Sequence, residues 1–261
     1  GATGKLLVLV HGLCLNDEQW LHHGHDHGTS LERDLSYSPV YLRYNSGLHV
    51  SQNGHTLADL LETLVSEWPV PLEDLVLLCH SMGGQVSRSA CHYAREADHG
   101  WIKKLRTLIF LGTPHHGAPP EKVGNWVHQV IGISPYSAPL ARLARIRSAG
   151  ITDLRHGSLL DEEWQGQDRF DAPARQRLPV PLPPTVRCHF LAGTTARREG
   201  AAAGQLQGDG LVSLHSALGR HERAELNLSR PDQRWVGHGI NHMDLLSSDI
   251  VYQQIRTVLE R

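Results

Sequence analysis

A run of apolar residues that ends in a serine-containing turn is the feature that most constrains the fold. The run covers residues 75–79, the turn reads CHSMGG over 79–84, and a segment with helical character follows to about Ala97. This order of strand, tight turn and helix is typical of a nucleophile elbow, which holds a serine on a strained turn above a buried strand. The usual glycine two residues before Ser81 is replaced by the small Cys79. The alternative interpretation is an ordinary strand–helix turn that contains a serine.

Apolar runs alternate with helical patterns along the 261 residues, a length that suits one large α/β domain. Continuous apolar runs are expected of strands buried on both faces of a parallel sheet. Strands that alternate with helices imply right-handed crossovers in such a sheet. The expected strands cover residues 5–10, 38–44, 75–79, 107–111, 186–192 and 234–236. The expected helices lie within 16–35 and over 55–68, 85–97 and 249–259.

The character of the sequence changes between residues 118 and 184. Helix-like pieces near 123–131 and 139–148 are separated by glycines and polar turns, and a proline-rich stretch closes the segment. We interpret 118–184 as an insertion that caps the sheet. Residues 1–117 and 185–261 would then form the core domain, a mostly parallel sheet with helices on both faces.

A serine nucleophile needs a base, and the base needs a carboxylate that orients it. In elbow folds the chain order is nucleophile, acid, histidine. Asp209 lies between two glycines after an expected strand, and His242 precedes the last helix. Ser81, Asp209 and His242 would therefore meet at the carboxyl ends of the parallel strands.

Both partners of the serine have competitors. His238 is the alternative base, because two glycines flank it in a loop-like setting. An aspartate between glycines is often only a turn former. Other carboxylates also follow Ser81, most of them in the presumed cap: Asp153, Asp161, Asp168, Asp171 and Asp232.

An oxyanion hole needs two backbone N–H groups that point at the developing charge. The residue after the nucleophile, Met82, is expected to supply one of them. The other should come from the loop after the first strand, where Gly12 permits the turn and Leu13 carries the N–H group. We expect His11 to hold that loop by hydrogen bonds rather than to act in catalysis.

With these residues in view, the sequence resembles the α/β-hydrolase superfamily, and within it bacterial lipases and esterases. Five motifs carry the resemblance, in the family's order: LVLVHGL (7–13), CHSMGG (79–84), LGTPHHGAP (111–119), GDGLVS (208–213) and INHMDLL (240–246). The resemblance implies an α/β-hydrolase fold with Ser81, Asp209 and His242 as the catalytic triad. It also implies Leu13 and Met82 as the oxyanion donors.

The resemblance further indicates residues that line the substrate site. The segment 113–117 is similar to one that lines the base of the pocket in lipases, so His116 could reach the substrate. Trp126 could line the entrance or pack within the cap. Asp244 matches a carboxylate that binds structural calcium in lipases of pseudomonads. A second carboxylate for such a site would come from the loop before Asp209, which offers only Glu199. Because calcium prefers several oxygen ligands, we expect Asp244 to begin a helix rather than to bind calcium.

Composition excludes several other classes of protein. The formal net charge is -2, which indicates no nucleic-acid partner, and no apolar run is long enough to span a membrane. The sequence as given carries no signal peptide, which predicts a cytoplasmic protein, or a secreted one if a leader was removed. The scattered cysteines are expected to be reduced thiols. The histidine-rich segment 22–27 is expected to be a solvated loop, with adventitious metal binding as the alternative.

The sequence thus predicts a carboxylic ester hydrolase, an esterase or lipase that needs no cofactor and acts on a small-molecule or lipid ester. An apolar, medium-chain acyl group is expected, because a cap with apolar helices is predicted over the site. One alternative is another acyl-transfer enzyme, such as an amidase, a thioesterase or an acyltransferase. The other is a non-catalytic binding protein with a hydrolase fold. The sequence does not indicate an oligomeric state.

Overall fold

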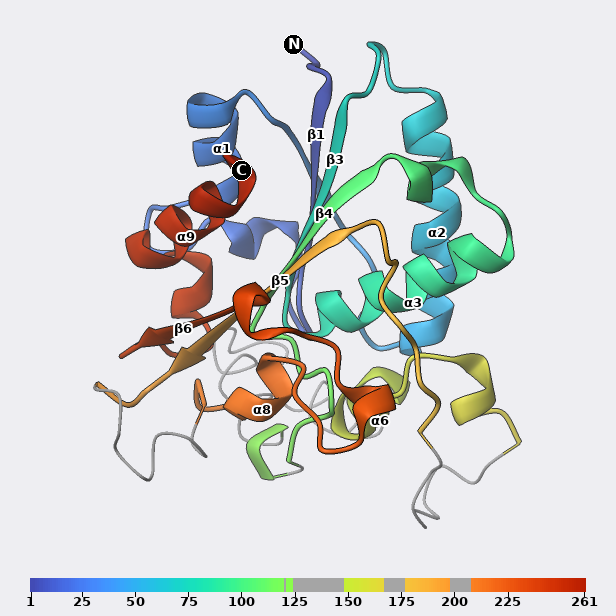
Figure 1. Cartoon of the computed structure of the whole chain (residues 1–261), viewed down its shortest axis with the longest axis vertical. Coiled ribbons are helices and arrows are strands. Elements are labelled where there is room, and N and C mark those ends of the chain that lie inside the picture. Colours follow the sequence, from blue (N-terminus) through green and yellow to red (C-terminus); the bar gives the residue numbers. More distant parts are fainter. Residues whose placement is uncertain (120, 124–147, 167–176, 198–207) are drawn as a thin grey trace, which may run out of the picture.

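A twisted parallel sheet forms the centre of the molecule (Figure 1). The computed structural model describes residues 1–119, 121–123, 148–166, 177–197 and 208–261. Within these ranges six strands pair in the order β2-β1-β3-β4-β5-β6, and every pair is parallel. The strands are β1 (Lys5–Val10), β2 (Ser38–Leu42), β3 (Asp74–His80), β4 (Leu105–Leu111), β5 (Arg187–Thr194) and β6 (Arg234–His238). The predicted parallel α/β fold is confirmed.

Helices cover both faces of the sheet, α1 and α9 on one face and α2 and α3 on the other (Figure 1). The α-helices are α1 (His27–Leu35), α2 (Val50–Ser66), α3 (Met82–Glu96), α6 (Ala149–His156), α8 (Leu214–Ala217) and α9 (Asp249–Leu259). Short 3-10 helices are η1 (Asp17–Trp20), η2 (Gly100–Lys103), η3 (Asp161–Glu163), η4 (Ala224–Leu226), η5 (Pro231–Gln233) and η6 (Asp244–Leu246). None of the helices in these ranges is long and apolar enough to cross a membrane.

The central strands divide the core into two layers, because successive side chains of a strand point to opposite faces. In β3, Leu75 and Leu77 pack with α2 and α3, whereas Val76 and Leu78 pack with α1 and α9. All four side chains are fully buried. The sheet is therefore a rigid platform whose strand ends can hold side chains in fixed positions.

Helix α2 begins at Val50, five residues before the predicted start at residue 55. A glycine inside a helix weakens it, and Gly54 lies within the first turns of α2. In the structure Gly54 lets α2 and α3 approach closely, since a Cβ atom there would clash with the side chain of Ser89. The close contact of the two helices explains why a glycine occupies the helix interior.

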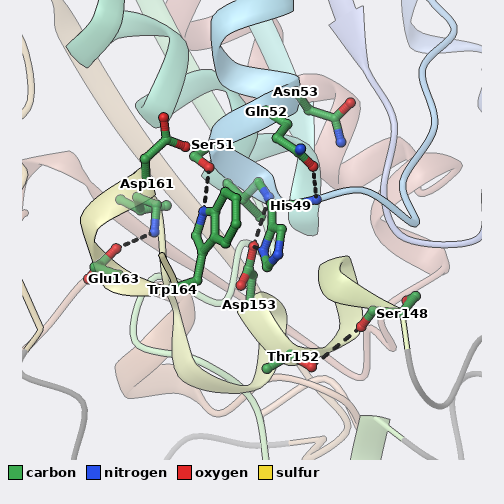
Figure 2. A network of polar contacts seen from close by, with 12 residues as sticks. His49, Ser51, Gln52, Asn53, Ser148, Thr152, Asp153, Asp161, Glu163 and Trp164 are labelled. Atoms are coloured by element: carbon green, nitrogen blue, oxygen red, sulfur yellow. Dashed lines mark hydrogen bonds and ion pairs between the residues drawn. The ribbon is translucent and has the colours of Figure 1, made fainter. Parts of the chain in front are cut away.

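Part of the predicted cap is fastened to the amino end of α2 (Figure 2). Asp153 of α6 accepts hydrogen bonds from His49 Nδ1 and from the Val50 N–H, both at 2.9 Å. The indole of Trp164 stacks on His49 with ring centroids 3.8 Å apart and donates to Ser51 at 2.9 Å. Asp153 also stabilises the helix start, because the amino end of a helix carries partial positive charge. Much of 118–184 lies outside the described residues, so its role as a cap stays a prediction.

The expectation of a solvated loop over residues 22–27 is wrong for His27. This side chain is fully buried and its Nε2 hydrogen-bonds to the Leu245 carbonyl at 3.0 Å, while its Nδ1 contacts His25 Nε2 at 2.8 Å. The ring also stacks beside Tyr252 of α9. His27 is buried because it starts α1 and joins that helix to the segment before α9. Burial lowers its pKa to about 4.

Candidate active site

Ser81 occupies the sharp turn between β3 and α3. Its φ of 53° and ψ of -125° are strained for a residue with a side chain, and the residue is 1 % exposed. The turn is possible because Gly83 and Gly84 pack directly against Val10 and Thr113, with no room for a Cβ atom at either glycine. Within the described residues the Ser81 hydroxyl makes no hydrogen bond. The serine is therefore presented on a strained turn, in a position suited to a nucleophile.

Cys79, in the place of the usual glycine, fits into the core behind the turn. The residue is fully buried, and its Sγ donates to Ser87 Oγ at 3.1 Å. Ser87 donates in turn to the Gly83 carbonyl at 2.8 Å. Burial raises the pKa of the Cys79 thiol to about 12, so the thiol stays protonated. The substitution is compatible with the elbow geometry.

Asp209 and His242 form a buried pair. Asp209 Oδ2 lies 2.6 Å from His242 Nδ1, and the two residues are 2 % and 3 % exposed. The other carboxylate oxygen accepts from the N–H groups of Leu211 at 3.0 Å and Val212 at 2.8 Å. Because the carboxylate accepts these three bonds, it is fixed in orientation and holds the imidazole through Nδ1.

Glycines make room for this pair. A Cβ atom at Gly112, which has a φ of +58°, would lie 2.9 Å from Asp209 Oδ2 and 3.1 Å from His242 Nδ1. A Cβ atom at Gly193 would lie 3.3 Å from Asp209 Cβ. Gly112 directly follows β4, and Gly193 lies near the end of β5. The carboxyl ends of these strands therefore shape the site.

Four of the competing residues lie in the described part of the chain. His238 ends β6, and its Nδ1 makes no hydrogen bond within the described part of the chain. Asp153 pairs with His49, Asp161 with His55 at 3.1 Å, and Asp232 with Arg230 at 3.4 Å. The remaining two predicted competitors, Asp168 and Asp171, lie outside the described residues.

The loop after β1 lies directly against the serine turn. A Cβ atom at Gly12 would be 2.9 Å from Ser81 Cβ, so this glycine allows the closest approach of the two segments. Leu13 follows in the same loop and is buried. Met82 is the first residue of α3, and the first N–H groups of a helix have no partner within it. The two predicted N–H donors therefore belong to segments that meet at Ser81.

His11 anchors this loop, as expected. Its ring stacks on Tyr44 with centroids 4.2 Å apart, and its Nδ1 is 2.9 Å from the Gly12 carbonyl. The Tyr44 hydroxyl donates to the His11 carbonyl at 2.7 Å. Burial lowers the pKa of His11 and favours the neutral ring. His11 thus fixes the position of Gly12 and, with it, of Leu13.

The sequence predicts no role for His80, which touches the site at two points. Its Nε2 lies 3.0 Å from the backbone carbonyl of His242, and the centroids of the two rings are 4.7 Å apart. A Cβ atom at Gly12 would lie 3.2 Å from its Nδ1. Burial, and then the neighbouring His242, hold the pKa of His80 well below its usual range. Its place beside Ser81 in the elbow is the sequence signal that could have identified it.

Three of the cavities in the described part of the chain bear on the predicted site residues. One of about 560 Å³ is lined by Asp209 and His242 together with polar neighbours such as Asn241 and Asp244. A second, of about 460 Å³, adjoins Leu13. A third, of about 510 Å³, contains His116 and includes neither Asp209 nor His242 among its described lining residues. The structure therefore places His116 in a different hollow, while Trp126 lies outside the described residues.

Asp244 begins η6, as expected for a helix-start residue. Its carboxylate accepts from the Asn241 N–H at 2.9 Å, and its own N–H donates to Asn241 Oδ1 at 3.0 Å. Glu199, the other candidate ligand for calcium, lies outside the described residues. In the described ranges no group of three or more His, Cys, Asp or Glu side chains is arranged to hold a metal ion. The calcium alternative stays a prediction.

The parallel sheet, the strained serine turn and the buried Asp–His pair together define a protein of the α/β-hydrolase type. A family model described as the PGAP1-like alpha/beta domain matches residues 2–176. The chain therefore belongs to the PGAP1-like α/β domain family. No curated protein matches the chain.

Several solved structures share the fold. Lipase BlEst2 of Bacillus licheniformis, in its mature form, is 18 % identical, with a TM-score of 0.62 over 98 % of this chain and 91 % of that one. YbtT, a type II thioesterase of the yersiniabactin pathway, is 16 % identical, with a TM-score of 0.53 over 100 % and 93 %. The metagenomic carboxyl esterase MGS0156 is 15 % identical, with a TM-score of 0.53 over 100 % and 78 %. At these identities the likeness shows the fold alone.

Proposed function

We propose that this protein is a serine hydrolase that cleaves carboxylic esters through an acyl-enzyme on Ser81. The observation that carries the proposal is the buried contact of 2.6 Å between Asp209 and His242, beside the strained turn of Ser81. The chain holds a second buried carboxylate–imidazole pair, Asp153 with His49, which fastens α6 to α2, so the pair at Asp209 is distinguished by its place beside the serine turn. The same pair is what a serine nucleophile requires.

In the proposed mechanism the Ser81 hydroxyl attacks the acyl carbon while His242 takes its proton. Asp209, bonded to Nδ1, keeps the proton on that nitrogen and leaves Nε2 as the base. The carboxylate also stabilises the imidazolium that forms. The Leu13 and Met82 N–H groups receive the oxyanion of the tetrahedral intermediate. His242 then protonates the leaving alcohol, and a water molecule activated by the same imidazole releases the acid.

The substrate is proposed to be a small-molecule or lipid ester with an apolar acyl group of medium length, as the sequence predicts. A thioester is the second candidate, because one of the solved structures that share the fold is a thioesterase. The same nucleophile, base and oxyanion donors serve both substrates, and a thioester differs in its leaving group.

A series of p-nitrophenyl esters from C2 to C16 tests the proposal, with an acyl thioester measured in parallel. Wild type should hydrolyse at least one ester, and the folded Ser81→Ala variant should lose this activity. Esterase activity that persists in Ser81→Ala would contradict the role of the serine. The chain-length optimum separates an esterase from a lipase. Addition of EDTA tests calcium at Asp244, because loss of activity or stability would indicate a bound metal ion.

A further inference from the structure

The cavity of about 510 Å³ beside the segment after β4 has five basic side chains among its eleven described lining residues. The lining includes two arginines, Arg155 and Arg220, and three histidines, among them His215 and His221. The one acidic side chain in the described lining is Glu222. A cleft lined by charges of one sign focuses the electrostatic potential and raises the local concentration of ions of the opposite sign.

In the described part of the chain, the two arginines on this cavity have no acidic partner. Within the described residues, the side chains of Arg155 and Arg220 take part in no hydrogen bond and no ion pair. Both residues are exposed at the rim. Elsewhere on this surface arginines do pair with carboxylates, as Arg223 does with Glu225 at 2.7 Å and Arg230 with Asp232 at 3.4 Å. The guanidinium groups of Arg155 and Arg220 are therefore available to a ligand.

More positive charge lies behind the cavity wall. Arg177 contacts His116 Nδ1 at 2.9 Å and donates to the His115 carbonyl, while Arg88 is buried in the layer beneath. Burial and the neighbouring Arg177 lower the pKa of Arg88 to about 9, and Glu163 offsets this only in part. Burial, and then Arg177, lower the pKa of His116 to about 3, so the ring that lines the cavity is neutral and Arg177 lies behind it.

The chain ties this cavity to the Asp209–His242 pair at two points. His116, in the wall, follows Gly112 by four residues, and Ser213, also in the wall, follows Asp209 by four residues. Four residues span at most about 14 Å. Helix α8, which begins directly after Ser213, lies below the carboxyl ends of the strands in Figure 1. The cavity wall therefore lies within about 14 Å of two residues of the site, Gly112 and Asp209.

We propose that this basic cavity binds an anionic group of the substrate, a phosphate or a carboxylate, while the ester lies at Ser81. The inference rests on the proposed function, which it extends by naming the charge of the substrate. Arginine suits this role, because its planar guanidinium matches carboxylate and phosphate oxygens with two parallel hydrogen bonds. The competing interpretation is a solvated basic rim, which would bind such anions no better than any other exposed arginine.

Binding measured without turnover tests the cavity directly. Phenyl phosphate and phenylacetate are titrated calorimetrically into full-length Ser81→Ala protein, in low salt. The same titration is made with Ser81→Ala combined with Arg155→Gln and Arg220→Gln. The matched control combines Ser81→Ala with Arg230→Gln, which removes an exposed arginine outside the cavity. We expect the Kd of at least one probe to rise about tenfold in the cavity variant and to stay unchanged in the control. Equal Kd values in all three proteins, or binding to none of them, would overturn the proposal.

Turnover provides the second measurement. The ratio of kcat/KM for mono-p-nitrophenyl glutarate to that for p-nitrophenyl valerate compares an anionic with a neutral acyl chain of the same length. We expect this ratio to fall at least about fivefold in Arg155→Gln/Arg220→Gln and to stay constant in Arg230→Gln. A constant ratio in the cavity variant would contradict the proposal. If no ester is hydrolysed but the calorimetric difference is found, the anion site stands and the proposed ester hydrolysis fails.

Discussion

His80 and His242 are joined by a hydrogen bond from the side chain of one to the backbone of the other. His80 Nε2 lies 3.0 Å from the His242 carbonyl, and since a carbonyl only accepts, this nitrogen carries the proton. His80 is also the chain neighbour of Ser81. A neutral, buried His80 therefore sets the distance between the turn that carries the proposed nucleophile and the loop that carries the proposed base.

This contact predicts a specific pattern in two variants. His80→Leu removes the donor and should lower kcat about fivefold with little change in KM, because one net hydrogen bond contributes about 1 kcal/mol. His80→Gln can place an amide N–H near the position of Nε2 and should recover most of the loss. Steady-state kinetics on a p-nitrophenyl ester provide the measurement. Equal losses in the two variants would show that His80 acts through packing alone.

Gly112 predicts a second effect on the Asp209–His242 pair. In Gly112→Ala the new methyl group would lie 2.9 Å from Asp209 Oδ2 and 3.1 Å from His242 Nδ1, so it should displace the pair and lower kcat at least tenfold. The matched control is Gly24→Ala, where φ is +77° and nothing lies within 4 Å of the added atom. This variant should lose about 1–2 kcal/mol of stability and keep its activity. Similar kcat values in the two variants would contradict the role of Gly112.

The buried histidines predict that stability falls in acid. Burial lowers the pKa of His27 to about 4, and the pKa values of His80 and His115 lie well below the usual range. Below pH 6.5 the unfolded chain binds more protons than the folded one, so the free energy of unfolding should decrease as the pH falls. His27 alone should account for about 2 kcal/mol between pH 7 and pH 5.

Urea denaturation at several pH values between 5 and 8 measures this slope. His27→Asn should reduce the slope, because it removes one of the groups that take up a proton on unfolding. Leu31→Ala, which shortens a fully buried side chain of the same helix, should lower the stability at every pH and leave the slope unchanged. A free energy of unfolding that is constant from pH 8 to pH 5 would disagree with burial of the neutral rings.

The order and type of the core elements could be predicted from the sequence, because buried parallel strands leave continuous apolar runs. The last helix has the predicted bounds, 249–259. The first residues of the helices were harder to predict from the sequence. Helix α3 begins at Met82, three residues before the predicted start, because Gly83 and Gly84 suggest a turn when read alone. Their contacts with Val10 and Thr113 come from distant parts of the chain, and no local pattern reveals them.

In the candidate site, too, local motifs predict some features, whereas others depend on contacts between distant segments. Ser81, Asp209 and His242 stand in motifs whose order indicates the chemistry, and the structure brings Asp209 and His242 within hydrogen-bonding distance. The burial of His27 and the contact of His80 with His242 depend on packing between segments more than 150 residues apart. A histidine-rich stretch by itself does not distinguish a buried ring from a solvated one.

Covalent labelling with a fluorophosphonate tests the central claim most directly, because the reagent reacts with a serine that a neighbouring base activates. The adduct is located by mass spectrometry of the full chain and of its peptides. We predict one adduct, on Ser81, no adduct in Ser81→Ala, and labelling slowed about 10³-fold or more in Asp209→Asn. An adduct on another residue, or no reaction of the folded wild-type protein, would contradict a nucleophile at Ser81.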